Sequence, residues 1–410
     1  MDFYTFELPN GIRVIHKQTS GNVSHCGLVI NAGSRDEHED KQGLAHYIEH
    51  CIFKGTEKRK TYHILSRLDN VGAELNAYTT KEETWVYASS LESHFDRAVE
   101  LIADICFSSV FPEKEIKKEK DVIIDEINSY LDVPGEMIFD DFEEYLFKGH
   151  PLGRNILGTQ QSVKGLQRKD ILEFVGRRYR TDQMVFSSVG PSSPKTVERI
   201  CMKYLMTVDP EPTDELRKGF DGADSFDLEL RKEANQVHFM LGTEAYHAGH
   251  EKKTGMVLLN NLLGGPAMNS RLNLHIREKH GIAYNIESSY QPYSDTGMFQ
   301  IYLGTDERSF ARAERLVMGE LKKLREKKLG ISQLRMAKQQ LVGQIALSQE
   351  SGAGTMIALG KSYLMYGRVD ALEEVYRSID ALTAEDLMEI ANEVFDPAKM
   401  SRLVYLPKSR

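Results

Sequence analysis

The stretch SVKGLQRKDILEFVGRRYRTDQMV, residues 162–185, returns in altered form at residues 378–401 as SIDALTAEDLMEIANEVFDPAKMS. The offset is 216 residues, and Leu166 matches Leu382 at this offset. Each copy has helical spacing and then runs into an apolar, strand-like segment. Similarity at a fixed offset of about half the chain indicates a duplicated domain. An accidental resemblance between two helix-then-strand segments is the alternative.

The length of the chain agrees with two domains. Its 410 residues exceed what one hydrophobic core usually supports. Between the two copies, residues 208–225 collect Pro, Gly and acidic side chains, as interdomain linkers do. We place the boundary near residue 215, which gives an N-terminal domain of residues 1–215 and a C-terminal domain of residues 216–410. Alternating strand-like runs followed by long helical stretches predict an α+β fold, with a mostly antiparallel sheet packed against helices in each domain.

Charge and cysteine usage exclude several classes of function. Lys and Arg number 52 against 61 Asp and Glu, so the net charge of −9 gives no attraction to nucleic acid or anionic membranes. The sequence shows no basic-then-apolar leader and no uninterrupted apolar run of about 18 residues. The four cysteines are widely spaced, which favours reduced thiols. We therefore expect a soluble, cytoplasmic protein that binds neither nucleic acid nor membrane.

The strongest local motif is H-x-x-E-H, formed by His46, Glu49 and His50. On a helix these side chains share an arc of roughly 100°, opposite Leu44 and Ile48. Imidazoles at i and i+4 can reach one Zn²⁺, while the carboxylate between them is placed beside a water molecule. The alternative is a helix whose histidines are only hydrogen-bonded. The motif therefore predicts a zinc site with His46 and His50 as ligands.

Residues 112–132, PEKEIKKEKDVIIDEINSYLD, offer carboxylates for a third ligand. With helical spacing, Glu119 and Glu126 fall two turns apart on a stripe of isoleucines, whereas Asp125 points off that stripe. A carboxylate on a buried stripe must be paired, protonated or bound to metal. A salt bridge is the alternative for each glutamate.

These motifs resemble those of the pitrilysin, or inverzincin, zinc metallopeptidases. The resemblance is carried in family order by LPNGIRVI, GSRDE, GLAHYIEHCIFKGT, GAELNAYTTKEETWVY, KKEKDVIIDEINSYLDVP, HPLGRNILGT and LLGGPAMNSRLNLHIREKHGIAYNI. It covers nearly the whole chain, which is similar to half-length members of the mitochondrial processing peptidase type. The resemblance implies peptide-bond hydrolysis with one Zn²⁺ per chain.

The resemblance also implies the remaining parts of the metal site. The family's third zinc ligand is a glutamate about 76 residues after the second motif histidine, and this position is Glu126. Glu119 matches a supporting glutamate one heptad earlier, which is expected to orient His50 or stabilise the site. Glu82 matches a further family glutamate, and a solvated surface carboxylate is the alternative there.

Substrate-binding residues follow from the same resemblance. Asn76 and Ala77 match an exposed strand edge that receives peptides by β-augmentation. Arg277 and Tyr284 match a pair that reaches substrate near zinc in relatives, and both side chains can donate to a carbonyl oxygen. Without the resemblance, Arg277 is a solvated helix residue and Tyr284 a half-buried strand residue.

The implied function is that of a zinc-dependent endopeptidase that hydrolyses unfolded or short peptides, with Glu49 as general base. The second copy has VLLNNLLGG in place of HYIEHCIFKG, so it lacks the metal ligands. A non-catalytic structural or assembly subunit is the main alternative, because the family includes such members. A metal-dependent hydrolase of a non-peptide bond is a third reading. Longer relatives fuse two such units, so we expect a homodimer or pairing with a related subunit.

Overall fold

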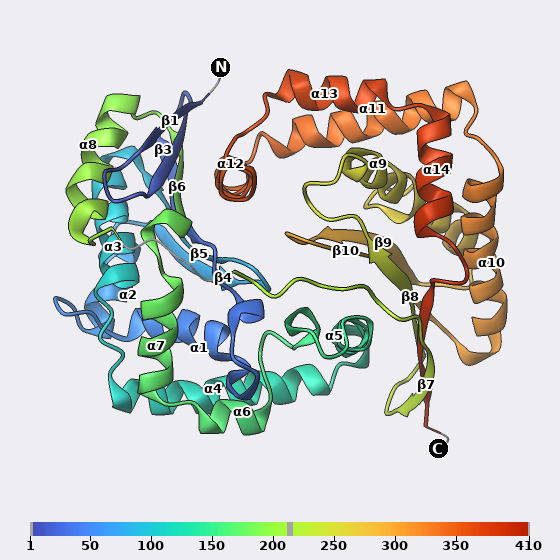
Figure 1. Ribbon diagram of the computed structural model, residues 1–410, viewed down its shortest axis with the longest axis horizontal. Coiled ribbons are helices and arrows are strands. Elements are labelled where there is room, and N and C mark those ends of the chain that lie inside the picture. The colour runs from blue at the N-terminus through green and yellow to red at the C-terminus, as the bar shows by residue number, and fades with distance from the viewer. Residues whose placement is uncertain (1–2, 211–215, 409–410) are drawn as a thin grey trace. The chain divides into compact units, whose positions relative to one another are not determined.

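The computed structural model describes residues 3–210 and 216–408, which divide into two compact units (Figure 1). The first unit comprises Met1–Asn128, Arg154–Arg217 and Ala346–Ala371, and the second comprises Ser129–Gly153, Lys218–Ile345 and Leu372–Arg410. The boundary expected near residue 215 lies at positions 211–215, outside the described residues. The compact units differ from the contiguous halves 1–215 and 216–410 because two segments are exchanged.

The first unit is built on a six-stranded sheet in the order β1-β2-β6-β3-β5-β4. Only β2 and β6 are parallel neighbours. Successive side chains point to opposite faces, and both faces are apolar: Leu28 and Phe186 lie in one core, and Val29 and Val185 in another. The strands are β1 (Tyr4–Glu7), β2 (Arg13–Gln18), β3 (Val23–Ile30), β4 (Glu74–Thr79), β5 (Thr84–Leu91) and β6 (Met184–Gly190).

Helices cover both faces of this sheet. The larger core is shared with α1 (Leu44–Cys51), α2 (Thr61–Asp69), α3 (Phe95–Phe107), α4 (Glu113–Leu131), α6 (Gln160–Gly165), α7 (Arg168–Arg178) and α8 (Pro194–Tyr204). On the opposite face, α12 (Gly352–Tyr366) packs against β3 and β6. Its Met356 and Leu359 join Ile15, Val29 and Trp85 in a separate buried cluster.

The second unit repeats this plan with five strands in the order β7-β11-β8-β10-β9. β7 and β11 are parallel, and the other neighbours are antiparallel. The order matches β2-β6-β3-β5-β4 of the first sheet, so the expectation of two duplicated α+β domains is confirmed. The strands are β7 (Asp227–Lys232), β8 (Val237–Ala245), β9 (Asn285–Pro292), β10 (Gly297–Thr305) and β11 (Ser401–Pro407).

Helices also cover both faces of the second sheet. One core is shared with α9 (Lys253–Gly264), α10 (Glu307–Glu326), α11 (Ile331–Ser348), α13 (Leu372–Ala381), α14 (Ala384–Val394) and the π-helical segment η8 (Asn273–Glu278). On the opposite face, α5 (Pro134–Leu146) contacts β8 and β11. Ile138 and Phe142 of α5 lie in one buried cluster with Met240 and Tyr405.

The repeated stretch forms the same structure in both units. Helices α7 and α14 begin 216 residues apart, from 168 to 384, and end 216 apart, from 178 to 394. The matched residues Asp170 and Asp386 make equivalent hydrogen bonds. Each accepts from the backbone N–H three residues earlier, at 2.7 and 2.8 Å. This contact closes a capping box at both helix N-termini.

The exchanged helices explain why the compact units are discontinuous. Each sheet has two apolar faces, and each face is removed from water only when another element packs against it. Helix α5, from the first half of the chain, covers the second sheet, and α12, from the second half, covers the first. Among residues 3–210 and 216–408, no helix is long and apolar enough to cross a membrane.

Candidate active site

Helix α1 presents the H-x-x-E-H motif on a short, firmly packed element. Its apolar face, which includes Ile48 and Cys51, is buried in the first core. The helix starts after Gly43, whose φ of 86° is the left-handed conformation that favours glycine. A Cβ at Gly43 would also lie 2.5 Å from the carbonyl oxygen of Leu157. The backbone before α1 therefore requires glycine for both conformation and space.

His46, His50 and Glu126 come together between α1 and α4. The Nε2 atoms of both histidines lie 3.8 Å from the same Oε2 of Glu126, and the three ligand atoms are all within 4.8 Å of one another. In a tetrahedral zinc site with bonds of about 2.1 Å, ligand atoms are about 3.4 Å apart. A small contraction would complete the site, so two imidazoles and one carboxylate fit Zn²⁺.

The electrostatic setting also suits a metal. Burial, reinforced by the neighbouring His50, lowers the pKa of His46 to about 4, which keeps the imidazole neutral at pH 7 as ligation requires. The side chain of Glu126 is 45% exposed. The expectation that Glu126 lies on a buried stripe is therefore wrong, because this end of α4 leaves its carboxylate open to solvent. One side of the His46–His50–Glu126 cluster is therefore open to solvent.

Glu119 lies behind His50, on the side away from the ligand cluster. Its Oε2 is 3.3 Å from Nδ1 of His50, while Nε2 of the same ring faces Glu126. Its Oε1 is 2.8 Å from Nζ of Lys54. Glu119 is buried, and a carboxylate on the second ring nitrogen fixes the orientation of a ligating imidazole. Lys54 was not anticipated from the sequence, since its pairing spans 65 positions, from 54 to 119.

Glu49 and the edge strand lie next to each other on the same unit. Glu49 is half-buried on α1, and this burial raises the pKa of its carboxyl group. Helix α1 packs against β4, the terminal strand of the sheet, which pairs only with β5 among residues 3–210 and 216–408. Asn76 and Ala77 lie on β4, opposite Tyr87 and Val86 of β5. The free side of β4 offers backbone groups to a further strand.

Arg277 and Tyr284 belong to the second unit. Arg277 lies in the π-helical segment η8, where its Nη1 is 3.4 Å from Oδ1 of Asn273. Its guanidinium is 6.0 Å from the centre of the Tyr284 ring, and Tyr284 is 87% exposed. The expectation of a half-buried strand residue at Tyr284 is wrong, because it precedes β9 (Asn285–Pro292). Their contact with substrate stays a prediction.

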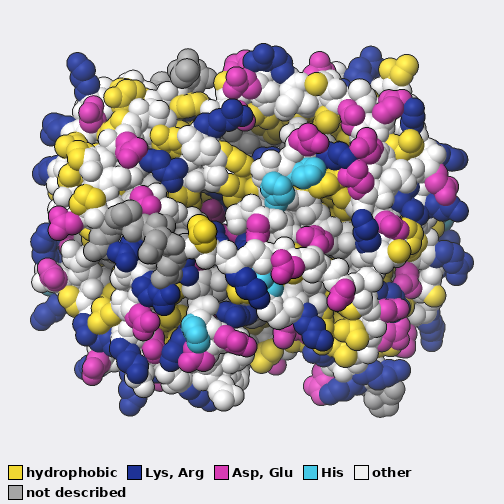
Figure 2. All heavy atoms as spheres, viewed as in Figure 1, with side chains coloured by type: hydrophobic (Ala, Val, Ile, Leu, Met, Phe, Trp, Pro, Cys, Tyr) yellow, Lys and Arg dark blue, Asp and Glu magenta, His cyan; other side chains and the backbone are white. Residues whose placement is uncertain are grey.

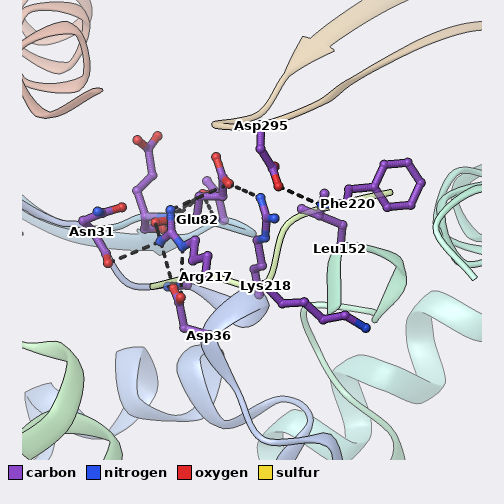
Figure 3. A network of polar contacts seen from close by, with 12 residues as sticks. Asn31, Asp36, Glu82, Leu152, Arg217, Lys218, Phe220 and Asp295 are labelled. Atoms are coloured by element: carbon purple, nitrogen blue, oxygen red, sulfur yellow. Dashed lines mark hydrogen bonds and ion pairs between the residues drawn. The ribbon is translucent and has the colours of Figure 1, made fainter. Parts of the chain in front are cut away.

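Glu82 is part of a buried ionic network (Figure 3). Its Oε1 lies 2.6 Å from Nη1 of Arg35, a side chain that is 1% exposed. Arg217 donates to both carboxylate oxygens of Asp36, at 2.9 and 2.8 Å, and to the backbone oxygen of Glu82. The alternative of a solvated surface carboxylate at Glu82 is therefore wrong. In the second unit, the backbone N–H of Phe220 donates to Asp295 at 3.0 Å.

With this fold and this cluster established, comparison with known proteins gives the class. Residues 13–160 match the family described as Insulinase (Peptidase family M16), and residues 165–341 match the Peptidase M16 inactive domain. The chain belongs to peptidase family M16, which is the pitrilysin family. The second match agrees with the absence of the H-x-x-E-H motif from the second copy.

Individual relatives support the same class. The uncharacterized zinc protease YmxG of Bacillus subtilis is 31% identical over 390 residues, which is 94% of each chain. An uncharacterized zinc protease of Rickettsia bellii is 30% identical and covers 98% of this chain and 97% of its own length. Among solved structures, a protease from Helicobacter pylori superposes with a TM-score of 0.91 at 21% identity, covering 99% of both chains. The two relatives are named zinc proteases, and the solved structure shows that this chain has the same fold over nearly its whole length.

Proposed function

We propose that this protein is a zinc-dependent endopeptidase that hydrolyses unfolded or short peptides. The observation that carries the proposal is the convergence of His46 and His50 on one oxygen of Glu126, with Glu49 on the same helix as the two histidines. Two imidazoles and one carboxylate are a typical donor set of a catalytic zinc site, in which the fourth position stays open for water or substrate.

The residues of the chain divide the chemistry between them. Zn²⁺ held by His46, His50 and Glu126 would supply Lewis acidity, which lowers the pKa of a water and polarises the scissile carbonyl. Glu49 accepts the proton that the attacking water loses as its oxygen bonds to the carbonyl carbon. Glu49 then returns this proton to the amine nitrogen as the C–N bond breaks. Glu119 holds His50 in orientation throughout.

Peptides of extended conformation suit the edge strand beside this site. An incoming peptide paired with the free side of β4 would use backbone hydrogen bonds at Asn76 and Ala77. Backbone pairing tolerates varied side chains and disfavours folded proteins, whose strands are already paired. We propose Arg277 and Tyr284 as donors to the substrate from the second unit.

Cleavage of an unstructured peptide library, read by mass spectrometry, tests this function. The zinc-loaded protein should cut peptides, a chelator should stop cleavage, and added zinc should restore it. Glu49→Gln should retain zinc and lose cleavage, whereas Glu57→Gln, an exposed glutamate beyond α1, should behave as the wild type. Zinc-loaded wild type that cuts nothing would instead favour the structural or assembly subunit.

Assembly and location complete the proposal. We propose a homodimer, since one chain carries both the metal ligands and the Arg277–Tyr284 pair. We also propose a cytoplasmic location. The four cysteines are buried and unpaired, as in proteins of reducing compartments. Light scattering coupled to size exclusion should give twice the 46.6 kDa chain mass, and a monomer at micromolar concentration would contradict the dimer.

A further inference from the structure

The zinc-binding helix has no N-terminal cap of its own. Helix α1 is eight residues long, and its N-cap residue, Gly43, has no side chain to accept a hydrogen bond. The first backbone N–H groups of a helix have no partner within the helix, and a buried helix end needs acceptors from elsewhere. In α1 this requirement matters more than usual, because His46 is only the third helical residue.

Glu37 supplies the missing acceptors from outside the helix. Its Oε2 accepts from the N–H of Gly43 at 2.9 Å, and its Oε1 accepts from the N–H of Ala45 at 2.8 Å. Glu37 is 5% exposed, so water cannot take its place readily. Ala45 directly precedes His46. One carboxyl group therefore fixes the turn that carries His46.

The segment at Asp36 and Glu37 is held by side chains from elsewhere in the chain. Its backbone oxygen accepts from Nη1 of Arg154 at 2.9 Å, and the backbone oxygen of Arg154 accepts from Nζ of Lys81 at 2.5 Å. The preceding residue, Asp36, is held by both nitrogens that Arg217 directs at it. These contacts hold the Glu37 backbone in place, while its side chain bonds to the N-terminus of α1.

The segment after Arg154 approaches the same helix end closely. A Cβ at Gly43 would lie 2.5 Å from the Leu157 carbonyl oxygen, and a Cβ at Gly158 would overlap the backbone of Gln42. Two conspicuous sequence motifs, GSRDE and HPLGRNILGT, thus meet at the N-terminus of α1. Neither motif provides a metal ligand or a proton-transfer group.

We propose that Glu37 is a positioning residue that holds the first turn of α1, and with it His46, in the geometry that binds zinc. Arg154 acts with it by fixing the Glu37 backbone. Without the Glu37 acceptors the first turn frays and His46 moves, while His50, a full turn later, keeps its intrahelical hydrogen bonds. This inference rests on the proposed zinc site, but it does not depend on peptidase activity.

Zinc affinity measured by competition with a chromogenic chelator tests the proposal. Glu37→Gln keeps the size of the side chain but turns one acceptor into a donor that faces a backbone N–H. We expect the zinc dissociation constant to rise at least tenfold, as happens when groups that orient metal ligands are lost. Glu39→Gln, an exposed glutamate in the same loop, should leave the constant unchanged.

Two further variants separate positioning from a general loss of stability. Gly360→Ala disturbs α12 on the far face of the sheet, so it should lower the melting temperature while zinc affinity stays the same. Arg154→Met should weaken zinc binding several-fold, and it replaces Glu37→Gln as the test if that variant does not fold. Zinc affinity within twofold of wild type in a folded Glu37→Gln or Arg154→Met variant would overturn the proposal. A wild type that binds zinc without cleaving peptides would refute only the proposed peptidase.

Discussion

Replacing Glu119 with glutamine should weaken zinc binding without removing any ligand. The carboxylate is 3.3 Å from Nδ1 of His50 and 2.8 Å from Nζ of Lys54, and its side chain is only 10% exposed, so solvent screens it little. Loss of a carboxylate that orients a ligating histidine typically costs 10–100-fold in metal affinity, which is about 1.4–2.7 kcal/mol. We expect the upper part of this range, because Lys54 then keeps its positive charge near the cation.

The assay is chelator competition on purified variants, combined with peptide cleavage at saturating zinc. Glu115→Gln, one helical turn earlier on α4 and partly exposed, is the matched control and should match the wild type. Adding Lys54→Met to Glu119→Gln should recover part of the lost affinity, because the uncompensated charge is gone. An unchanged zinc dissociation constant in Glu119→Gln would refute the assigned role of this carboxylate.

Three further predictions concern stability. A Cβ at Gly360 would overlap the buried ring of Trp85, so Gly360→Ala should lower the free energy of unfolding by about 1–3 kcal/mol, whereas Gly343→Ala, with open space in mid-helix, should raise it by up to about 1 kcal/mol in urea titrations. Burial raises the pKa of Glu37 to about 8, although the hydrogen bonds from two backbone N–H groups and the charge of Arg154 each lower it. Above pH 4.5 the unfolded state has released the Glu37 proton, whereas the folded state still holds it up to about pH 8. The free energy of unfolding of the zinc-free protein should therefore fall as the pH rises from 4.5 to 8. Glu37 contributes at most about 1.4 kcal/mol per pH unit to this fall. Denaturation curves across this range should lose that slope in Glu37→Gln, and equal slopes in both proteins would contradict the assignment.

Local pattern was sufficient for the elements whose structure is decided locally. The capping residues Asp170 and Asp386 lie within the repeated stretch, so the internal similarity already marked where α7 and α14 begin. His46 and His50 share one helical face by spacing alone, and their ring centres are 4.6 Å apart. Glu126 needed the resemblance as well, because its partners are about 80 positions away.

Contacts between residues that are far apart in the sequence could not be predicted from local pattern. Glu82 looked like a surface carboxylate because Arg35, which neutralises it, is 47 positions earlier in the sequence. Glu37 gave one usable signal: it is an acidic residue six positions before Gly43, the N-cap glycine, which has no side chain to cap α1. The choice of sheet for α5 and α12 had no signal, since an apolar helix face is compatible with either sheet.

The exchange of α5 and α12 has a consequence for how the protein is made. During synthesis the first sheet can form once β6 has emerged. The face of that sheet that carries Ile15, Val29 and Trp85 stays exposed to water until α12 is translated, more than 160 residues later. A nascent chain of this kind exposes an apolar sheet surface while the intervening segment is synthesised, which is when aggregation competes with folding. Chaperones that act on nascent chains therefore have a defined surface to protect, and the N-terminal half cannot mature on its own.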